Sequence, residues 1–323
     1  MTLRVVLIGL LACACAWSLA IGPLPWSEVD RTVLMLRATR LGAGLLAGAA
    51  LAVAGVLMQG LFRNPLASPS VAGVTAGAGL GAQIALVAFT CAAPWASAAV
   101  PLAWWLPIGA FAGAAGALAA LYALARRRAD LTSVLLIGMV LSILFSAMAA
   151  YLLAIGQETY QLGRALVAFS LGALEGASPA TVAMAVPLVV VGTIAAWGWG
   201  RPLDLVLSGE AEAASLGVDL VRARRWLLAW TALLAATSVT LGGGVGFVCL
   251  VVPNALRAWQ GPAHRPLVVS AAIGGALFLT LADICARVCH PGPGEIPLGV
   301  ITGLVGAPFF LWFFRRERRA GRM

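Results

Sequence analysis

Arginine side chains are the groups in this chain best suited to bind another charged group. All 21 basic residues are arginine, and only 12 residues are acidic. Asp283 and Arg287 are four positions apart, so on a helix they share one face and can pair. Arg37 and Arg40 precede a long apolar run, where a planar guanidinium can grip a carboxylate through two hydrogen bonds. Lipid headgroup binding is the alternative role for these two arginines.

Covalent chemistry has few candidate residues. No Ser-His-Asp set, carboxylate pair or metal-ligand cluster stands out, and none of the six cysteines forms a Cys-x-x-Cys pair. Cys289-His290 is a weak haem or metal candidate, because it lacks supporting ligands. The sequence contains no lysine, which excludes a phosphate-binding Gly-Lys-Ser/Thr loop. We therefore expect no enzyme activity, no metal and no cofactor in this chain, and any ATP hydrolysis must come from another protein.

The composition is that of a membrane protein. Of the 323 residues, 62% are hydrophobic and 10% are charged, whereas a soluble domain carries about 25% charged residues. This excludes a soluble enzyme, a disordered chain and a secreted disulfide scaffold. The apolar residues form long continuous runs and do not alternate, which argues against a barrel. We expect an all-α polytopic membrane protein that forms one transmembrane domain over residues 1–323.

A bilayer core requires about 20 apolar residues per helix, and ten runs qualify or nearly qualify. The eighth run is short and contains Pro253, which predicts a broken or partial span. The first run resembles a signal peptide, but we interpret it as an uncleaved span. The ten predicted spans are residues 4–22, 41–62, 71–92, 101–125, 131–154, 179–199, 226–242, 245–259, 267–289 and 298–314.

The arginine distribution predicts the orientation. With ten spans both termini lie on one side, and placing them in the cytoplasm puts 16 arginines inside and five outside. The arginines flank apolar runs and form no phosphate-tracking face, so nucleic acid is not an expected partner. The inside arginines are Arg4, Arg63, Arg126, Arg127, Arg128, Arg201, Arg222, Arg224, Arg225, Arg257, Arg265, Arg315, Arg316, Arg318, Arg319 and Arg322, and the outside ones are Arg31, Arg37, Arg40, Arg164 and Arg287.

Glycine and proline indicate how the spans are packed and interrupted. Pairs such as Gly77/Gly81 and Gly109/Gly113 are spaced by four and predict close helix packing. Three consecutive glycines, Gly242, Gly243 and Gly244, should interrupt a helix and permit a hinge. Similar segments recur in residues 1–178 and 179–323, which predicts two five-span halves of opposite orientation.

The surroundings of four polar residues in or near the predicted spans indicate their roles. Gln59 lies mid-span, where an interhelical hydrogen bond is the favoured interpretation and a pathway role the alternative. Asn254 follows Pro253 and can satisfy a backbone group that the proline frees. For Asp283 and Arg287, an ion pair that holds helices together is favoured over substrate contact. The full set of hinge or pathway candidates is Gln59, Asn64, Pro65, Gly242, Gly243, Gly244, Pro253, Asn254 and Asp283.

Residues 201–225 form the longest predicted cytoplasmic loop. Ser208 can cap a short helix that has Glu210 and Glu212 in its first turn, where the helix dipole favours them. Such a compact amphipathic piece fits a groove on a partner, although a lipid-surface helix or a plain connector is the alternative. Its small apolar face consists of Ala213, Ala214 and Leu216, and Gly217 ends it.

Several segments resemble one protein family in their residues and in their order along the chain. The segments are residues 36–41, 48–59 and 63–69, then 203–218, then 246–257, and finally residues from His264-Arg265 through Ala282-Asp283 and Glu295-Ile296-Pro297 to Gly306-Ala307-Pro308-Phe309. Together they resemble the permease subunits of type II ABC importers for ferric siderophores, haem or vitamin B12, the FecCD/BtuC-like family. The chain departs from that family at Asn254, where a histidine commonly follows the proline.

The resemblance implies partners and sites. It implies a homodimer in the bacterial inner membrane, two ATPase subunits that hold ATP and Mg, and an extracytoplasmic substrate-binding protein that meets Arg37, Arg40 and Arg287. It implies import by alternating access and leaves the cargo open among siderophore, haem and cobalamin. The segment that would dock on the ATPase comprises Leu207, Ser208, Gly209, Glu210, Ala213, Ala214, Leu216 and Gly217.

Two alternatives remain on the residues alone. An ion-coupled secondary transporter needs ionisable groups inside the membrane, and Asp283 is the main candidate. A receptor or scaffold that moves no solute is the second alternative.

Overall fold

The computed structural model describes residues 2–22, 29–91, 102–125, 131–157, 160–289 and 295–319. All thirteen elements in these residues are α-helices. Each of the ten predicted spans coincides with a helix, and α7, α9 and α10 are additional. The helices are α1 Thr2–Ala20, α2 Arg31–Phe62, α3 Val74–Cys91, α5 Leu102–Leu124, α6 Leu131–Gly156, α7 Tyr160–Leu171, α8 Pro179–Gly198, α9 Gly200–Ser208, α10 Glu210–Ser215, α11 Leu220–Gly242, α12 Val248–Gln260, α13 His264–Val288 and α14 Leu298–Arg319.

Seven of the described helices are long and apolar enough to cross a membrane: α1, α2, α3, α5, α6, α8 and α13. Helix α14 contributes a shorter apolar stretch, Leu298–Phe313. Helix α12 has 13 residues, about 20 Å of helix against a hydrocarbon core of about 30 Å. The prediction of a short eighth span is therefore confirmed, but α12 runs unbroken through Pro253.

Helix α2 begins ten residues before the predicted start of the second span. Its first residue is Arg31, and the preceding Asp30 caps it by accepting a hydrogen bond from the Val33 N–H at 2.8 Å. The prediction that Arg37 and Arg40 lie just before the second span is therefore wrong, because the apolar helix Arg31–Phe62 holds them in its second and third turns. Helix α2 has 32 residues, a length of about 48 Å.

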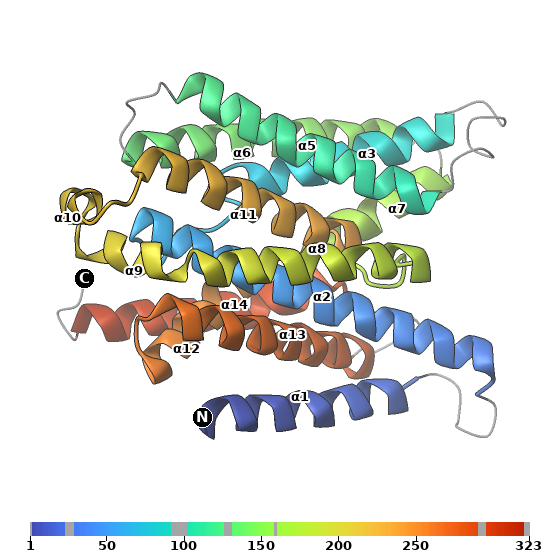
Figure 1. Cartoon of the computed structure of the whole chain (residues 1–323). Helices are drawn as coiled ribbons and strands as arrows, with labels where there is room; N and C mark the ends of the chain where they lie inside the picture. The colour runs from blue at the N-terminus through green and yellow to red at the C-terminus, as the bar shows by residue number, and fades with distance from the viewer. Residues whose placement is uncertain are drawn as a thin grey trace.

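Helix α2 forms the centre of the bundle. Every residue from 50 to 62 is buried. Figure 1 shows α2 running through the middle, with α3, α5 and α6 on one side and α12, α13 and α14 on the other, while α1 lies at the edge beside α13. Sequence-distant helices therefore surround one apolar axis.

Small residues allow the helix backbones to touch. A Cβ atom added to Gly81 of α3 would collide with the carbonyl oxygen of Gly109 on α5, and one added to Gly113 would collide with the carbonyl oxygen of Gly77. The predicted glycine stripes are thus confirmed for this helix pair. Apolar packing of this kind gives contacts that lipid tails cannot supply.

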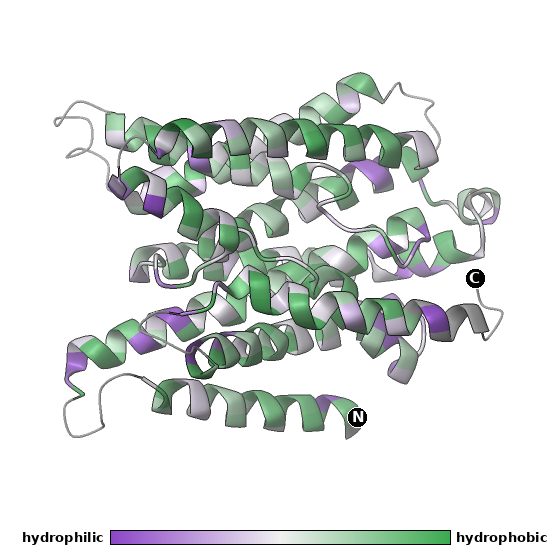
Figure 2. Cartoon of the chain, turned by 180° about the vertical axis from the view of Figure 1, so that it is seen from behind, coloured by the Kyte–Doolittle hydropathy of each residue, from purple (hydrophilic) through white to green (hydrophobic). Residues whose placement is uncertain are grey.

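The outside of the bundle is apolar as well. Large side chains such as Ile143 and Val140 on α6 are 70% and 66% exposed, which suits a surface solvated by lipid. Figure 2 shows hydrophobic residues along the outer helices and most hydrophilic residues toward the two ends of the bundle. The polar ends are where binding or coupling sites must lie.

Candidate functional site: charged clusters at the two ends of the bundle

At one end of the bundle, five charged side chains form what we call the charge cluster: Arg40, Glu175, Asp283, Arg287 and Glu295. Arg40 donates to Asp283 Oδ1 from Nε at 2.9 Å and to Glu295 Oε1 from Nη1 at 2.8 Å. Arg287 Nη2 lies 2.8 Å from Asp283 Oδ2. The Asp283 carboxylate, only 4% exposed, is therefore held between two guanidinium groups. The predicted Asp283–Arg287 pair is confirmed, and Arg40 joins it.

Arg37 and Arg287 also bind the end of α1. Arg37 Nη1 donates to the carbonyl oxygen of Leu19 at 2.9 Å. Arg287 Nη1 donates to the carbonyl oxygens of Ser18 and Ile21, at 3.0 and 3.1 Å. The last carbonyls of a helix have no donors within the helix, so these arginines satisfy α1 and hold it against α2 and α13.

The three arginines assigned to binding-protein docking thus point into the protein. Arg37 is buried at 9% exposure, the Arg287 side chain is 8% exposed and that of Arg40 is 17% exposed. A docking role for them stays a prediction, and Arg40 is the most accessible of the three. A cavity of about 340 Å³ opens beside Arg40 and is lined in part by Arg164 and Glu175.

The pKa values of two carboxyl groups in the cluster are shifted in opposite directions. Burial favours the neutral form of Glu295, but the hydrogen bond and charge of Arg40 outweigh it and lower the pKa of this carboxyl. Burial raises the pKa of Glu175, and its hydrogen bond to Glu295 and the charge of Glu295 raise it further. The side chain of Glu175 is 62% exposed, so it is the acidic group of the cluster that faces outward most.

At the opposite end, the predicted loop 201–225 is mostly helical. Helix α8 ends at Gly198, α9 begins at Gly200, and Trp199 between them keeps helical backbone angles. The prediction that Ser208 caps a helix is wrong, because Ser208 is the last residue of α9. Gly209 occupies the cap position of α10 with φ 141°, a backbone angle that residues with a Cβ rarely adopt.

Helix α10 presents a different surface from the predicted one. Ala213 is fully buried, so it does not share an outer face with Ala214 and Leu216. Leu207 and Leu216 are 42% and 61% exposed. Gly217, with φ 86°, follows the end of α10 as predicted. Glu212 lies in the first turn as expected, and α10 starts at Glu210.

Helix α9 is tied to the start of α13 through Asp204. Its Oδ1 accepts the His264 backbone N–H at 2.9 Å and contacts the His264 ring Nδ1 at 2.7 Å. Next to it, the Arg265 guanidinium lies 4.3 Å from the ring centroid of Trp197 on α8. The helices at residues 200–215 are therefore fixed to a helix that spans the bundle.

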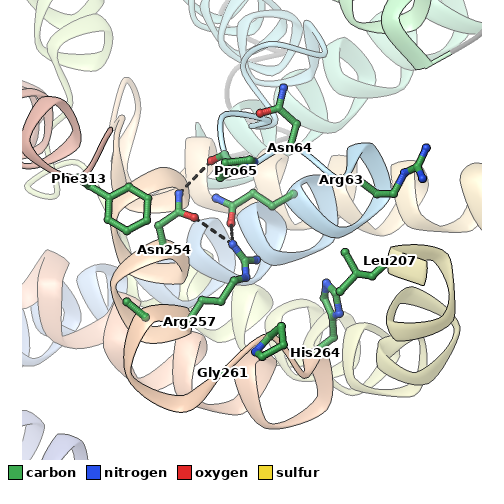
Figure 3. Close-up of a pocket in the computed structure, with 12 residues that line it drawn as sticks. Arg63, Asn64, Pro65, Leu207, Asn254, Arg257, Gly261, His264 and Phe313 are labelled. Atoms are coloured by element: carbon green, nitrogen blue, oxygen red, sulfur yellow. Dashed lines mark hydrogen bonds between the residues drawn. The ribbon is translucent and has the colours of Figure 1, made fainter. Parts of the chain in front are cut away.

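A pocket of about 480 Å³ lies beside this junction (Figure 3). Arg257 of α12 donates from Nη1 to Gln59 Oε1 at 2.9 Å and to Asn254 Oδ1 at 3.0 Å. We call it the Arg257 pocket. Its lining residues are Gln59, Arg63, Asn64, Pro65, Leu207, Asn254, Arg257, Ala258, Gly261, Pro262, His264 and Phe313.

Gln59, and not Asn254, donates to the carbonyl that Pro253 leaves without its helical donor. Pro253 has no N–H, so the Cys249 carbonyl four residues earlier lacks its helical donor. Gln59 Nε2 supplies that donor at 3.0 Å, which confirms an interhelical hydrogen bond. Asn254 instead donates to the carbonyl oxygens of Pro65 and Leu250, both at 2.9 Å, so the prediction that it serves the proline-freed group is wrong.

The turn after α2 is built by Arg63, Asn64 and Pro65. Arg63 has φ 47°, and the Asn64 Oδ1 accepts the Leu66 N–H at 2.9 Å. The turn supplies the Pro65 carbonyl that Asn254 binds. Asn64 and Pro65 therefore position the end of α2 against α12.

The glycine run lies at the middle of the bundle, where α11 ends. The helix stops at Gly242, Gly243 has φ 62°, and the Gly244 N–H donates to the Phe169 carbonyl of α7 at 2.9 Å. A Cβ atom on Gly244 would collide with the Ser170 carbonyl oxygen. The predicted interruption is confirmed, and a hinge at these residues stays a prediction.

The weak Cys289-His290 metal candidate begins at the C-terminal cap of α13. Cys289 is exposed, while His290 lies outside the described residues. Within the residues that the structure describes, no three His, Cys, Asp or Glu side chains converge as a metal site would require.

A bundle of long apolar helices with a charge cluster at one end and a short helical extension at the other is the architecture of a multi-pass membrane protein. The chain belongs to the FecCD transport family, whose pattern it matches over residues 5–316. This result confirms the resemblance found in the sequence.

Relatives within this family share most of the chain's length. The cobalamin import system permease protein BtuC of Halobacterium salinarum is 38% identical over 88% of this chain and 74% of the relative. The Fe(3+) dicitrate transport system permease protein FecD of Escherichia coli is 36% identical over 97% and 98%. The hemin transport system permease protein HmuU of Yersinia pestis is 35% identical over 89% and 85%.

A solved structure supports the same fold. A metal-chelate type ABC transporter in an inward-facing conformation is 28% identical, with a TM-score of 0.83 over 96% of this chain and 97% of that one. The all-helical type II importer permease architecture is therefore the fold of this chain.

Several contacts had no signal in the sequence. Asp204 and His264 are 60 positions apart, and Arg40 and Asp283 are 243 apart. Hydropathy places charged residues near span ends but does not say which ends meet. Gln59 and Pro253 did carry a signal, because a mid-span amide and a mid-helix proline each require a partner.

Proposed function

We propose that this chain is the membrane-spanning subunit of an ATP-driven importer that carries an iron chelate (siderophore or haem) or cobalamin across the inner membrane. The supporting observation is family membership over residues 5–316. Named relatives act on cobalamin, ferric dicitrate and hemin. The chain itself would perform no covalent chemistry; it would switch between inward-open and outward-open states.

The proposed assembly contains two copies of this chain, two ATP-binding cassette subunits that hold ATP and Mg, and an extracytoplasmic binding protein. We place both termini in the cytoplasm, because the arginine bias favours it. This orientation puts α9, α10 and the Arg257 pocket inside and the charge cluster outside. We also retain the division into halves 1–178 and 179–323, with residues 201–225 as the coupling segment.

A mechanical route from the ATPase follows from the contacts of α9. We infer that the ATPase binds the exposed Leu207 and Leu216, so that its closure moves α9 and α10. Asp204 would pass that movement to His264 at the start of α13. Helix α13 has 25 residues, about 37 Å of rigid rod, and carries Asp283 of the charge cluster at its other end.

The outer end of that route is the docking site of the binding protein. A carboxylate from the binding protein would compete with Glu295 for the guanidinium of Arg40, the most accessible arginine of the cluster. The Arg40→Gln variant should bind the binding protein more weakly, most clearly at low salt, where surface charges are least screened. Arg31→Gln, an exposed arginine at the start of α2, is the control. Equal losses in both variants would contradict the assignment.

Reconstitution in vesicles tests the function as a whole. Vesicles that contain the chain with its ATPase and binding protein should accumulate the cargo when ATP is supplied. Exchanging residues 208–217 for a polar linker should abolish uptake while the bundle stays folded. Uptake that needs an ion gradient and no ATPase would overturn the proposal in favour of a secondary transporter. Asp283, held by two arginines, gives that alternative no free carboxylate.

A further inference from the structure

A cavity of about 530 Å³ lies between the ends of α5, α6 and α11, away from the charge cluster and the Arg257 pocket. Its floor is apolar, because Leu121, Val134 and Leu228 are 1%, 3% and 1% exposed. Its polar groups are the Tyr122 hydroxyl and two guanidinium groups. The lining residues are Leu121, Tyr122, Ala125, Val134, Val221, Arg224, Arg225 and Leu228.

The charged residues that line this cavity, among those that the structure describes, are both basic: Arg224 and Arg225. Arg224 and Arg225 lie close enough to act electrostatically on the Tyr122 hydroxyl, so the three polar groups face one region. The nearby Asp219 carboxylate is engaged elsewhere, where it caps α11 by accepting the Arg222 N–H at 2.9 Å. The cavity therefore offers a cationic mouth above an apolar floor.

The position of the cavity matches the level of lipid headgroups. Arg225 lies in the second turn of α11, and the next residue, Trp226, is 47% exposed and stacks on Trp230. Exposed tryptophans gather at membrane–water interfaces. On the cytoplasmic side, basic pockets between transmembrane helices suit anionic lipid headgroups. An apolar chain alone would not require the arginines, and a soluble anion would not require the apolar floor.

We propose that this cavity binds one anionic phospholipid, with its phosphate at Arg225 and Tyr122 and part of an acyl chain against Leu121, Val134 and Leu228. The bound lipid would join α11 to α5 and α6. Because α11 ends at the Gly242 interruption, the lipid would hold the helix whose other end carries the proposed hinge.

The headgroup is tested on the purified assembly of this chain with its partners, by native mass spectrometry with phosphatidylglycerol and phosphatidylcholine as probes. Phosphatidylglycerol should bind in preference to phosphatidylcholine. Arg225→Gln should weaken phosphatidylglycerol binding about five-fold, which corresponds to about 1 kcal/mol. Arg222→Gln is the control, since Arg222 is exposed on the same helix and does not line the cavity. Equal effects of both variants, or equal binding of both lipids, would overturn the proposal.

The apolar part has its own test. Ala125→Trp would fill the cavity, whereas Ala123→Trp places the same side chain on the exposed side of α5. The first variant should lose the bound lipid and the second should keep it. Displacement of the lipid by inorganic phosphate would overturn the proposal, because it would show a soluble anion site. The readout is lipid retention, so it distinguishes this site from failure of the proposed transport function.

Discussion

Removal of the Asp283 carboxylate should destabilise the protein strongly. The Asp283→Ala variant leaves Arg287, 8% exposed, without its ion pair, and takes one of three acidic partners from Arg40. Breaking a buried pair from one side costs about 3–5 kcal/mol, because the remaining charge stays buried. Arg287 keeps its hydrogen bonds to the carbonyls at the end of α1. We therefore expect the free energy of unfolding to fall by about 3 kcal/mol, the lower end of this range.

A double variant tests whether Asp283 and Arg287 stabilise the protein as a pair. Asp283→Ala combined with Arg287→Met removes both charges and should cost less than the sum of the single changes, by at least about 1 kcal/mol. Unfolding in mixed micelles, followed by circular dichroism, measures all three variants against the wild-type chain. Additive costs, or a loss under about 1 kcal/mol for Asp283→Ala, would show that the ion pair does not hold α13 in place.

Three further changes probe other contacts. Gln59→Leu should lower the free energy of unfolding by about 1–3 kcal/mol, because it removes the donor that Gln59 gives to the Cys249 carbonyl. A loss below about 0.5 kcal/mol, the lower end for one hydrogen bond, would refute this prediction. Asp204→Ala should reduce ATP-driven uptake while the ATPase activity of the assembly persists. The free energy of unfolding should fall by about 1 kcal/mol, because the first N–H of α13 loses its acceptor. Unchanged uptake would contradict the proposed route from the ATPase through Asp204 to α13. The pKa of Glu175 is raised above its ordinary value of 4.5, so its stabilising contribution is present below about pH 4.5 and is lost as the pH rises through the raised pKa. Glu175→Gln should therefore stabilise the protein near neutral pH by less than about 1 kcal/mol, since the group is largely exposed; unfolding curves at several pH values that match the wild type would contradict this.

Hydropathy and helix chemistry predicted the spans but not how their ends meet. Continuous apolar runs located ten of the thirteen described helices, and Pro253 predicted that one of them would be short or broken. The early start of α2 was visible in principle, because Asp30 is a strong N-cap residue placed before Arg31. Hydropathy alone places the start later, because Arg31, Arg37 and Arg40 interrupt the apolar residues of the first three turns.

The coupling segment shows a second limit. A serine before two glutamates is typical of a helix start, yet Ser208 ends α9 and Gly209 takes the cap position. Amphipathic packing of Leu203 and Val206 extends α9 to that point, and tertiary packing outweighs a local capping preference. Pairing of Arg40 with Asp283 required knowledge that α2 and α13 are neighbours, which no local pattern carries.

The hydrogen bond from Gln59 to the Cys249 carbonyl has a consequence for how this chain can vary. An ordinary residue at position 253 would bring its own N–H and make the amide at position 59 dispensable for that carbonyl. We therefore expect positions 59 and 253 to change together among related sequences. A designer who replaces Pro253 gains freedom to substitute Gln59, whereas replacing Gln59 first removes the donor that its side chain gives to the Cys249 carbonyl.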